Sequence, residues 1–356
     1  MVPASGSSPV GFAEVPDFHV AIARRADPAL NDRPIVVGGD PRKQGRVVAA
    51  SESLRSIGIQ EGWRVAEALD RAPEAIWVPT DMARAREASG ALRAAVREII
   101  DAIEVDGLAG FFMRAPRDPE EARAWATTLA TNVLARTDLP LRTGVAPARF
   151  AAQLAAREAG EAGVCVVSSE DFEAFLLRQP LERLPGVGPK TAARLAELGV
   201  VDVPSLRALG LERLEVLLGN HGRTLWLLAS GEDPKPLRVR RHPETLSRAE
   251  TLAEAVDLAD ALEAPLRRLS GGLERALRRE GLRAARLALR LTAPDDRVLT
   301  RSFAFERPVA AAEMLFAAAR SLVAHVDLVR HPARRIALVL KGLEAGEATE
   351  RQLDLF

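Results

Sequence analysis

A glycine-rich turn between two predicted helices has the composition of a phosphate-binding hairpin. Leu184-Pro-Gly-Val-Gly-Pro-Lys190 runs directly into Thr191-Ala-Ala-Arg-Leu195, which is a helix-hairpin-helix signature. Glycine adopts backbone conformations that other residues avoid, and a turn without side chains lets the N–H groups of the following helix meet a phosphate. Such contacts hold DNA without reading its sequence. The predicted contacts are Gly186, Val187, Gly188 and Lys190. The alternative is an ordinary glycine turn.

Basic side chains are concentrated in the C-terminal third of a chain whose net charge is zero. Residues 235–343 contain 21 Lys and Arg against 13 Asp and Glu, a balance of +8, whereas residues 1–234 contain 27 against 32, a balance of −5. A basic region on an acidic body indicates that one part of the protein holds a phosphate backbone. The alternative is an arginine-rich surface that contacts only solvent. The candidate phosphate contacts are Arg238, Arg240 and Arg241 in a linker, and Arg286 and Arg290 on a predicted strand.

Length and composition are typical of a soluble multidomain protein from a reducing compartment. A chain of 356 residues is expected to divide into about two to four units. Its one cysteine, Cys165, cannot form an internal disulfide. We find no signal peptide and no stretch of the ~20 apolar residues that a membrane span needs, so we expect a cytoplasmic protein with no membrane partner. Because His and Cys form no metal-ligand pattern, we expect no cofactor.

The elements that must position these residues alternate in the first half of the chain. Strands are predicted near residues 10–15, 104–109, 141–146 and 164–167, and helices at 81–103, 119–136 and 150–159. This alternation indicates a sheet covered by helices. Residues 168–230 have a purely helical pattern. After the linker, helices at 252–269 and 273–279 and strands at 286–291, 300–305 and 335–340 indicate an α+β domain.

Short sequences along nearly the whole chain resemble the Y family of DNA polymerases. They are Arg33-Pro-Ile-Val-Val-Gly-Gly39, Val48-Ala-Ala-Ser51, Gly58-Ile-Gln-Glu-Gly62, Thr143-Gly-Val-Ala-Pro147, and Pro185–Val200 with Ala229-Ser-Gly-Glu-Asp-Pro234. The resemblance implies an α+β multidomain fold with right-hand architecture. The implied parts are the palm at 1–30 and 75–167, fingers at 31–74, a helical thumb at 168–234, a linker at 235–243, a little finger at 244–343 and a flexible tail at 344–356.

The same resemblance implies that the polymerase site is altered. The family's first strand opens with Asp-x-Asp-x-Phe, and its first acid falls on Glu14. A later strand of the family carries an Asp-Glu pair, which here reads Asp106-Gly107. Those acids hold two magnesium ions in the family, and two-metal phosphoryl transfer needs several converging carboxylates. Arg55 stands where the family contacts the triphosphate, and His19 stands at the aromatic position that excludes ribonucleotides.

These departures favour a chain that keeps the polymerase body without its chemistry, so we expect it not to be an enzyme. Asp-Gly-Leu at 106–108 resembles ImuB, an inactive branch of the family. The resemblance predicts a non-catalytic adaptor in translesion synthesis, DNA repair and mutagenesis, which binds primed or damaged DNA. The alternative is an active translesion DNA polymerase that uses Mg²⁺ and divergent ligands, Glu14 and Asp106 with Asp17. A third hypothesis is a structural protein that binds only a sliding clamp.

The C-terminal residues resemble a bacterial clamp-binding peptide. They read Gln352-Leu353-Asp354-Leu355-Phe356. An exposed tail ending in Leu-Phe has nothing of its own to bury these side chains against, and an apolar groove on a partner can take both. We therefore predict binding to the bacterial sliding clamp, whereas the alternative is a terminal turn that packs back on the preceding domain. The ImuB resemblance adds two further partners, an error-prone replicative-type polymerase and a RecA-like accessory protein.

Overall fold

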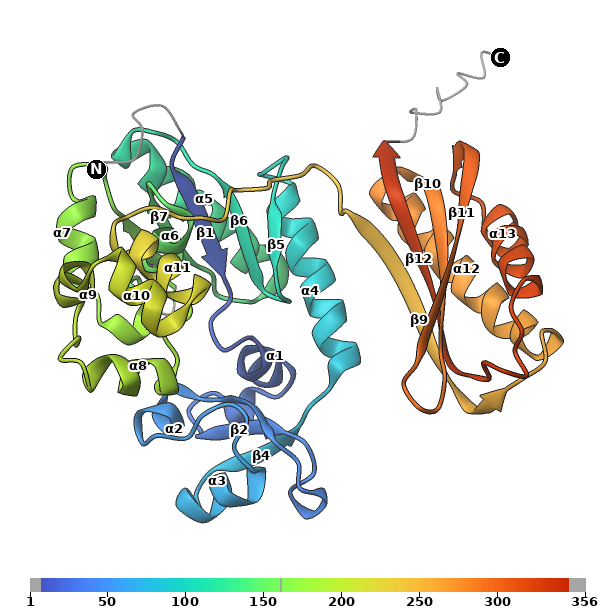
Figure 1. The fold of residues 1–356 in the computed structure, drawn as a ribbon, viewed down its shortest axis with the longest axis horizontal. Helices are drawn as coiled ribbons and strands as arrows, with labels where there is room; N and C mark the ends of the chain where they lie inside the picture. Colours follow the sequence, from blue (N-terminus) through green and yellow to red (C-terminus); the bar gives the residue numbers. More distant parts are fainter. Residues whose placement is uncertain (1–7, 161, 346–356) are drawn as a thin grey trace. The chain divides into compact units, whose positions relative to one another are not determined.

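The computed structural model describes residues 8–160 and 162–345, which form two compact units (Figure 1). The first unit comprises Met1–Val239 and the second comprises Arg240–Phe356. The first contains a five-stranded sheet, a three-stranded sheet and a group of short helices. The second contains a four-stranded sheet with helices on one face. Each unit has its own hydrophobic core.

The larger sheet of the first unit is ordered β5-β6-β1-β7-β8. Its strands are β1 (Val10–Glu14), β5 (Glu104–Asp106), β6 (Gly110–Arg114), β7 (Arg142–Ala146) and β8 (Val164–Val166). Strand β1 is antiparallel to both β6 and β7, so the first strand of the chain lies in the middle of the sheet.

Helices cover both faces of this sheet, which is why β1 and β6 are almost continuously apolar. Phe12 packs on one face with residues of α6 (Arg149–Glu158). Phe111 packs on the other face with residues of α4 (Met82–Arg97) and α5 (Pro119–Thr137). Burying one such phenylalanine side chain stabilises the fold by about 1.5–3 kcal/mol.

Helix α6 closely approaches β7 at Gly144. A Cβ atom added there would lie 2.2 Å from the carbonyl oxygen of Ala152 and 2.2 Å from the amide nitrogen of Ala156. Only a residue without a side chain allows this approach. Gly144 pairs with Phe12, so α6 lies on the face of the sheet that Phe12 occupies.

A smaller sheet, ordered β3-β2-β4, follows α1 (Phe18–Ala26). Its strands are β2 (Ile35–Gly38), β3 (Val47–Ala50) and β4 (Ile76–Pro79), accompanied by α2 (Glu52–Ser56) and α3 (Val65–Arg71). The buried hydroxyl of Ser51 accepts a hydrogen bond from the backbone N–H of Ile35 at 3.0 Å. This bond fixes the start of α2 against β2.

The remaining helices of the first unit share a core with the α6 face of the larger sheet. They are α7 (Phe172–Leu177), α8 (Pro189–Ala196), α9 (Val203–Leu209), α10 (Leu211–Leu218) and α11 (Asn220–Ala229). Buried side chains of these helices form one cluster with Phe12 and α6. The helical part is thus packed onto the sheet rather than attached by a loop alone.

The second unit is an antiparallel sheet ordered β11-β10-β12-β9. Its elements are β9 (Thr245–Val256), α12 (Glu263–Glu280), β10 (Leu282–Thr292), β11 (Val298–Val309), α13 (Ala312–Ala324) and β12 (Ala333–Ala345). Alternate leucines of β10 and β12 are buried with residues of both helices. The opposite face of the sheet carries the intervening side chains, because successive strand residues point to opposite faces.

Several elements differ from those predicted. The helix predicted at 252–269 is wrong, since β9 runs to Val256 and α12 begins only at Glu263. Leu252 and Val256 have helical spacing, but β9 is an edge strand in which Leu252 is the one residue classed as buried, so strand alternation is hard to see. Helix α4 ends at Arg97, short of the predicted residue 103.

None of the helices in residues 8–160 and 162–345 has the length and apolarity required to span a membrane.

Candidate functional site

Two carboxylates, Glu14 and Asp106, lie in one row across the larger sheet. Asp106 pairs with Gly110, Gly110 pairs with Glu14, and Glu14 pairs with Arg142. Residues paired in this way point to the same face of a sheet, so the three side chains share the α6 face. Gly110 places no side chain between the two carboxylates. The Cα atoms of Glu14 and Asp106 are two strand spacings, about 9–10 Å, apart. We call Asp106, Gly110, Glu14 and Arg142 the carboxylate row.

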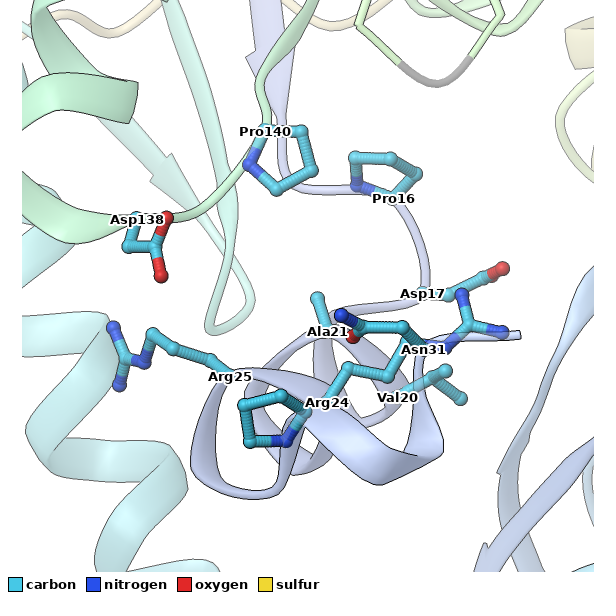
Figure 2. A pocket seen from close by; sticks show the side chains of 10 residues that line it. Pro16, Asp17, Val20, Ala21, Arg24, Arg25, Asn31, Asp138 and Pro140 are labelled. Atoms are coloured by element: carbon cyan, nitrogen blue, oxygen red, sulfur yellow. The ribbon is translucent and has the colours of Figure 1, made fainter. Parts of the chain in front are cut away.

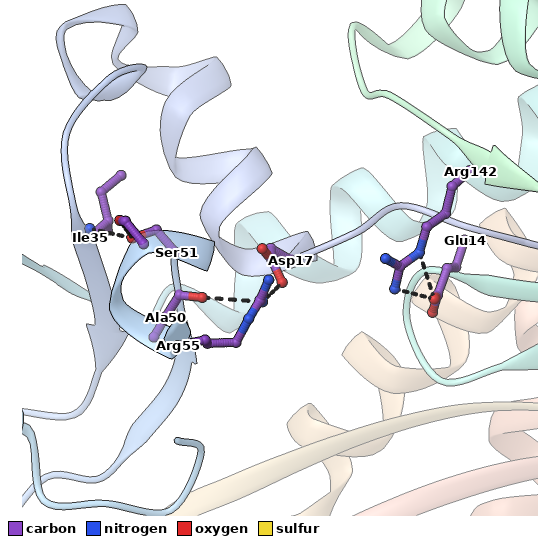
Figure 3. Close-up of polar contacts among 8 residues, drawn as sticks. Glu14, Asp17, Ile35, Ala50, Ser51, Arg55 and Arg142 are labelled. Atoms are coloured by element: carbon purple, nitrogen blue, oxygen red, sulfur yellow. Dashed lines mark hydrogen bonds and ion pairs between the residues drawn. The ribbon is translucent and has the colours of Figure 1, made fainter. Parts of the chain in front are cut away.

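Arg142 binds one oxygen of the Glu14 carboxylate (Figure 3). Its Nε and Nη2 atoms donate hydrogen bonds to Oε1 at 2.9 and 2.6 Å. The two side chains are 21% and 24% exposed, so solvent screens this pair less than it screens a surface ion pair. Arg142 could not be found from the sequence, because only the pairing of two strands distant in sequence brings it to Glu14.

Helix α6 supplies partners for the carboxylates of β5. Nε2 of Gln153 donates to Oδ2 of Asp106 at 3.1 Å, and Nη2 of Arg149 donates to Oε1 of Glu104 at 2.7 Å. The guanidinium of Arg149 lies 3.7 Å from the centre of the Phe112 ring. The close approach of α6 to the sheet makes these contacts possible, and Gln153 was also missed by sequence reasoning.

The carboxylate row opens into a cavity of about 250 Å³ between the start of α1 and the β3–α2 region. The charged and titratable side chains that line it are Glu14, Asp17, His19, Arg55, Glu61 and Asp106. The structure therefore brings together the predicted residues Glu14, Asp106 and Arg55. Glu61 was missed, because nothing in its sequence context marks a cavity wall.

Asp17 holds Arg55 at this cavity (Figure 3). Nη1 of Arg55 donates to Oδ1 of Asp17 and, at 3.3 Å, to the carbonyl oxygen of Ala50. Asp17 precedes α1 with a φ of 47°, a left-handed conformation that aspartate adopts more readily than most residues. Arg55 binds only one oxygen of the Asp17 carboxylate, so Asp17 as a third metal ligand stays a prediction from the sequence.

His19 lies in the same cavity on the first turn of α1. Burial lowers the pKa of its imidazole from the ordinary value of 6.5, and the nearby carboxylate of Glu61 opposes this shift. The neutral ring is therefore favoured near neutral pH. Its ring packs edge-on against Phe18, with the ring centroids 5.8 Å apart.

A second cavity, of about 280 Å³, shares Asp17 with the first. Figure 2 shows two prolines on one side of this cavity and α1, with Arg24 and Arg25, on the other. Asp17 and Asp138 also line it. Because the two acids balance the two arginines, charge selects no class of ligand there, and we assign it no role.

The predicted hairpin places its glycines at the start of α8. Gly186 has a φ of 92°, and a Cβ there would lie 2.7 Å from the His221 ring. Both the backbone conformation and the close approach of the ring therefore require glycine. Gly188 precedes α8 without a side-chain cap, which leaves the first-turn N–H groups facing outward without a side-chain acceptor. The Val187 side chain is buried in the core, so only its backbone is available for a contact. Lys190 is exposed.

The open face of the second unit's sheet is polar and basic. Arg286 pairs with Lys341, and three rows further along Thr292 pairs with Arg335, on the same face as Arg290. The paired rows on this face are Thr245, Lys341, Arg286 and Ala304; Ser247, Val339, Ala288 and Ser302; Ala249, Ala337, Arg290 and Thr300; and Thr251, Arg335, Thr292 and Val298. None of these residues is acidic. We call this surface the basic sheet face; Lys341 and Arg335 were missed from the sequence.

The three linker arginines are divided between the two units. Arg240 and Arg241 line a cavity of about 590 Å³ in the second unit that also contains Lys341, and Arg240 pairs with Glu244 at 3.4 Å. Arg238 belongs to the first unit, where its backbone N–H donates to Oε2 of Glu104 at 2.6 Å. The predicted clamp-binding residues Gln352–Phe356 lie outside the described residues and stay a prediction from the sequence.

Comparisons with known proteins identify the class. Residues 14–157 match the impB/mucB/samB family and residues 243–355 match the impB/mucB/samB family C-terminal domain. The chain is 32% identical to DNA polymerase IV of Halorhodospira halophila over 95% of both chains. It is 31% identical to DNA polymerase IV of Xanthomonas campestris over 94% of this chain and 93% of that protein.

Solved structures show the same fold. The chain is similar to DinB from Sulfolobus solfataricus, with a TM-score of 0.73 and 21% identity over 95% of this chain and 99% of that one. An insertion ternary complex of Dbh DNA polymerase gives a TM-score of 0.72 and 21% identity over 94% and 98%. The α+β, right-hand fold predicted from the sequence is confirmed as that of the Y-family DNA polymerases. The chain belongs to the impB/mucB/samB family, a family of Y-family DNA polymerases.

The expectation that the chain is not an enzyme is wrong. Two relatives that align over nearly their whole length are named DNA polymerase IV, which is an enzyme, and the comparisons do not single out the inactive ImuB branch. The expectation gave too much weight to Gly107. This residue lies in the turn after β5 with a φ of 64°, outside the carboxylate row, so its missing side chain leaves Asp106 and Glu14 in register.

The family implies divalent metal ions, and the carboxylates of Glu14 and Asp106, which line one cavity, are the candidate ligands in this chain. Arg142 and Gln153 each bind one carboxylate oxygen, which leaves Oε2 of Glu14 and Oδ1 of Asp106 without a hydrogen-bond partner in the described part of the chain. Mg²⁺ is commonly held by one or two carboxylates together with substrate phosphates. A second ion finds fewer ligands: residues 8–160 and 162–345 contain no group of three His, Cys, Asp or Glu suited to a metal.

His19 gives the site a testable pH dependence. Because its pKa is lower in the folded protein than in the unfolded chain, the unfolded chain binds the proton first as pH falls. The contribution of His19 to the free energy of unfolding is therefore fully present above pH 6.5 and is lost as pH falls from 6.5 through the folded pKa. NMR titration of the His19 ring should give a midpoint below 6.5, and His19→Gln should remove this part of the pH dependence. A midpoint at or above 6.5 would contradict the assignment.

Proposed function

We propose that this protein is a DNA-directed DNA polymerase that extends primed DNA in translesion synthesis, with Glu14 and Asp106 as divergent metal ligands. The observation that carries the proposal is the gathering of Glu14, Asp106 and Arg55 around one cavity. It occurs in a chain that aligns over nearly its whole length with proteins named DNA polymerase IV.

The neighbours of the two carboxylates, Arg142 in the carboxylate row and Gln153 on α6, act by positioning. Arg142 and Gln153 each fix one oxygen of a carboxylate, so that the remaining oxygens of Glu14 and Asp106 are presented as ligands. A bound Mg²⁺ supplies the positive charge that phosphoryl transfer requires at the phosphates. No step here depends on a side chain at position 107.

Arg55 and His19 serve the incoming nucleotide. The Arg55 guanidinium is a planar, permanently charged donor suited to phosphate oxygens, and Asp17 and the Ala50 carbonyl hold it at the cavity. His19 lies on the cavity wall at the position where the family resemblance implies a ring that excludes ribonucleotides. Its neutral form adds bulk without adding charge beside the triphosphate.

DNA is held by its backbone rather than by its bases. The basic sheet face offers Arg286, Arg290, Arg335 and Lys341 with no acid among the paired residues. The hairpin offers exposed N–H groups at the start of α8 beside Lys190. Both kinds of contact bind phosphates without selecting a sequence.

Primer extension tests the proposed activity. The purified chain should extend a primed template with Mg²⁺ or Mn²⁺, and Asp106→Asn should lower the rate by about 100-fold or more, because the loss of a ligand weakens the cation site. Asp101→Asn is the matched control, since Asp101 is an exposed carboxylate outside the carboxylate row. Absence of extension by the wild-type chain with either ion, while it still binds the DNA, would contradict the proposal and favour a non-catalytic adaptor.

The salt dependence of DNA binding tests the basic sheet face. Arg286→Ala and Arg290→Ala should each weaken binding to a primed duplex and lower the slope of log affinity against log salt by about 1, whatever the sequence. Fluorescence anisotropy across about 50–200 mM salt measures this slope. Arg320→Ala is the control, because Arg320 is exposed on α13, which packs on the opposite face. Equal slopes for all three variants would show that this face does not contact DNA.

A further inference from the structure

We infer that Asp17 competes with the incoming nucleotide for Arg55. In the protein without nucleotide, the Asp17 carboxylate binds Nη1 of the Arg55 guanidinium, so a phosphate oxygen can take this donor only by displacing it. Asp17 thereby lowers the affinity for the nucleotide, and because it acts through Arg55 it is a positioning residue. The inference rests on the proposed function for the role of Arg55 and goes beyond it in the role of Asp17.

The Asp17–Arg55 pair joins two elements at the wall of one cavity (Figure 3). Asp17 directly precedes α1, and Arg55 lies on α2, 38 positions further along the chain. Both residues line the cavity of about 250 Å³ that contains Glu14 and Asp106. The Asp17 and Arg55 side chains are 22% and 44% exposed, so a ligand in the cavity can reach the pair.

The Asp17 side chain binds Arg55 instead of capping its own helix. Aspartate before a helix commonly accepts a hydrogen bond from the first-turn N–H groups, as Asp81 does at α4 and Asp118 at α5. Asp17 makes no such bond at α1, and its φ is 47°. Its carboxylate is directed to the arginine rather than to the helix, which indicates a specific contact between the two side chains.

The two hydrogen bonds from Nη1 account for both of its N–H groups. One goes to Oδ1 of Asp17, and the other goes to the carbonyl oxygen of Ala50 at 3.3 Å. The Ala50 carbonyl is neutral and belongs to the backbone of β3, so it can keep Arg55 at the cavity. The Asp17 carboxylate is the mobile acceptor, and a guanidinium binds carboxylate and phosphate oxygens with the same donors. A bound phosphate therefore replaces Asp17.

Nucleotide affinity measured without chemistry tests the competition. A deoxynucleoside triphosphate with Mg²⁺ is titrated calorimetrically into the full chain bound to a primed duplex whose primer lacks its 3′-hydroxyl. Asp17→Asn should lower the dissociation constant about fivefold, because the charged competitor is lost. Asparagine is the chosen replacement, since it tolerates the left-handed backbone at this position.

Glu61→Gln is the matched control for charge. It removes one negative charge from the same cavity, but at an exposed residue whose charge solvent screens. We expect it to lower the dissociation constant by less than about twofold. Equal effects of Asp17→Asn and Glu61→Gln would show that general repulsion, and not competition for Arg55, limits nucleotide binding, and would overturn the inference.

A double-mutant cycle shows whether Asp17 acts through Arg55. Arg55→Gln should weaken nucleotide binding, and in that background Asp17→Asn should not restore any affinity. Thermal unfolding of every variant checks that it is folded. Restored affinity in the Arg55→Gln background, or unchanged, weaker or undetectable binding by folded Asp17→Asn alone, would each overturn the inference. Weaker binding is the result expected if Asp17 were a metal ligand.

The outcome is independent of primer extension. A chain that extends primers, yet binds the nucleotide equally well with or without Asp17→Asn, would retain the proposed function and lose this inference. A chain that binds the nucleotide more tightly after Asp17→Asn with the expected cycle, yet extends no primer in the wild type, would retain the inference and lose the proposed function.

Discussion

The register of β1 between β6 and β7 is the constraint on which the site depends. Glu14 lies opposite Gly110 on one side and Arg142 on the other, and a slip of one residue would turn its carboxylate to the opposite face of the sheet. The core prevents that slip. Phe12 is buried with residues of α6, and its neighbour Ala13 is buried with residues of α4 and α5, so each must keep its face. Apolar packing therefore decides where the carboxylate of Glu14 points.

Gly144 extends the same constraint to Asp106. It lets α6 approach β7 closely, and this approach carries Gln153 to Asp106 and Arg149 to Glu104. A larger residue at 144 would force the helix away from the sheet and release these hydrogen bonds. The orientation of both carboxylates is thus set by backbone packing and by neighbours that bind one oxygen each. Such preorganisation matters because phosphoryl transfer is catalysed mainly by positioning and charge.

The fold and part of the site could be predicted from the sequence. Short motifs led to Glu14, Asp106 and Arg55, and the structure places all three around one cavity. The positive charge balance of the C-terminal third led to Arg286 and Arg290 on a predicted strand, and the structure places them on the basic sheet face. These features lie in short stretches that resemble family motifs or in local charge composition, which is why a single sequence reveals them.

Other features depend on contacts between residues that are distant in the sequence. Arg142 is 128 positions from Glu14, and Gln153 is 47 from Asp106, so no local pattern connects them. Edge strand β9 resembled a helix because so few of its side chains are buried. The missing acid at position 107 suggested lost chemistry, yet the carboxylate row does not include that position. The residue types could be read from the sequence, whereas strand register shows which of them lie together on one face of the sheet.

A crystal structure of the chain with Mn²⁺, a primed template whose primer lacks its 3′-hydroxyl, and an incoming deoxynucleotide would test the central claim most directly. Anomalous scattering locates each Mn²⁺ without assumptions about its ligands. The account predicts Mn²⁺ coordinated by both Glu14 and Asp106, with Arg142 still bound to Glu14. A nucleotide bound without any metal at Glu14 and Asp106 would contradict it.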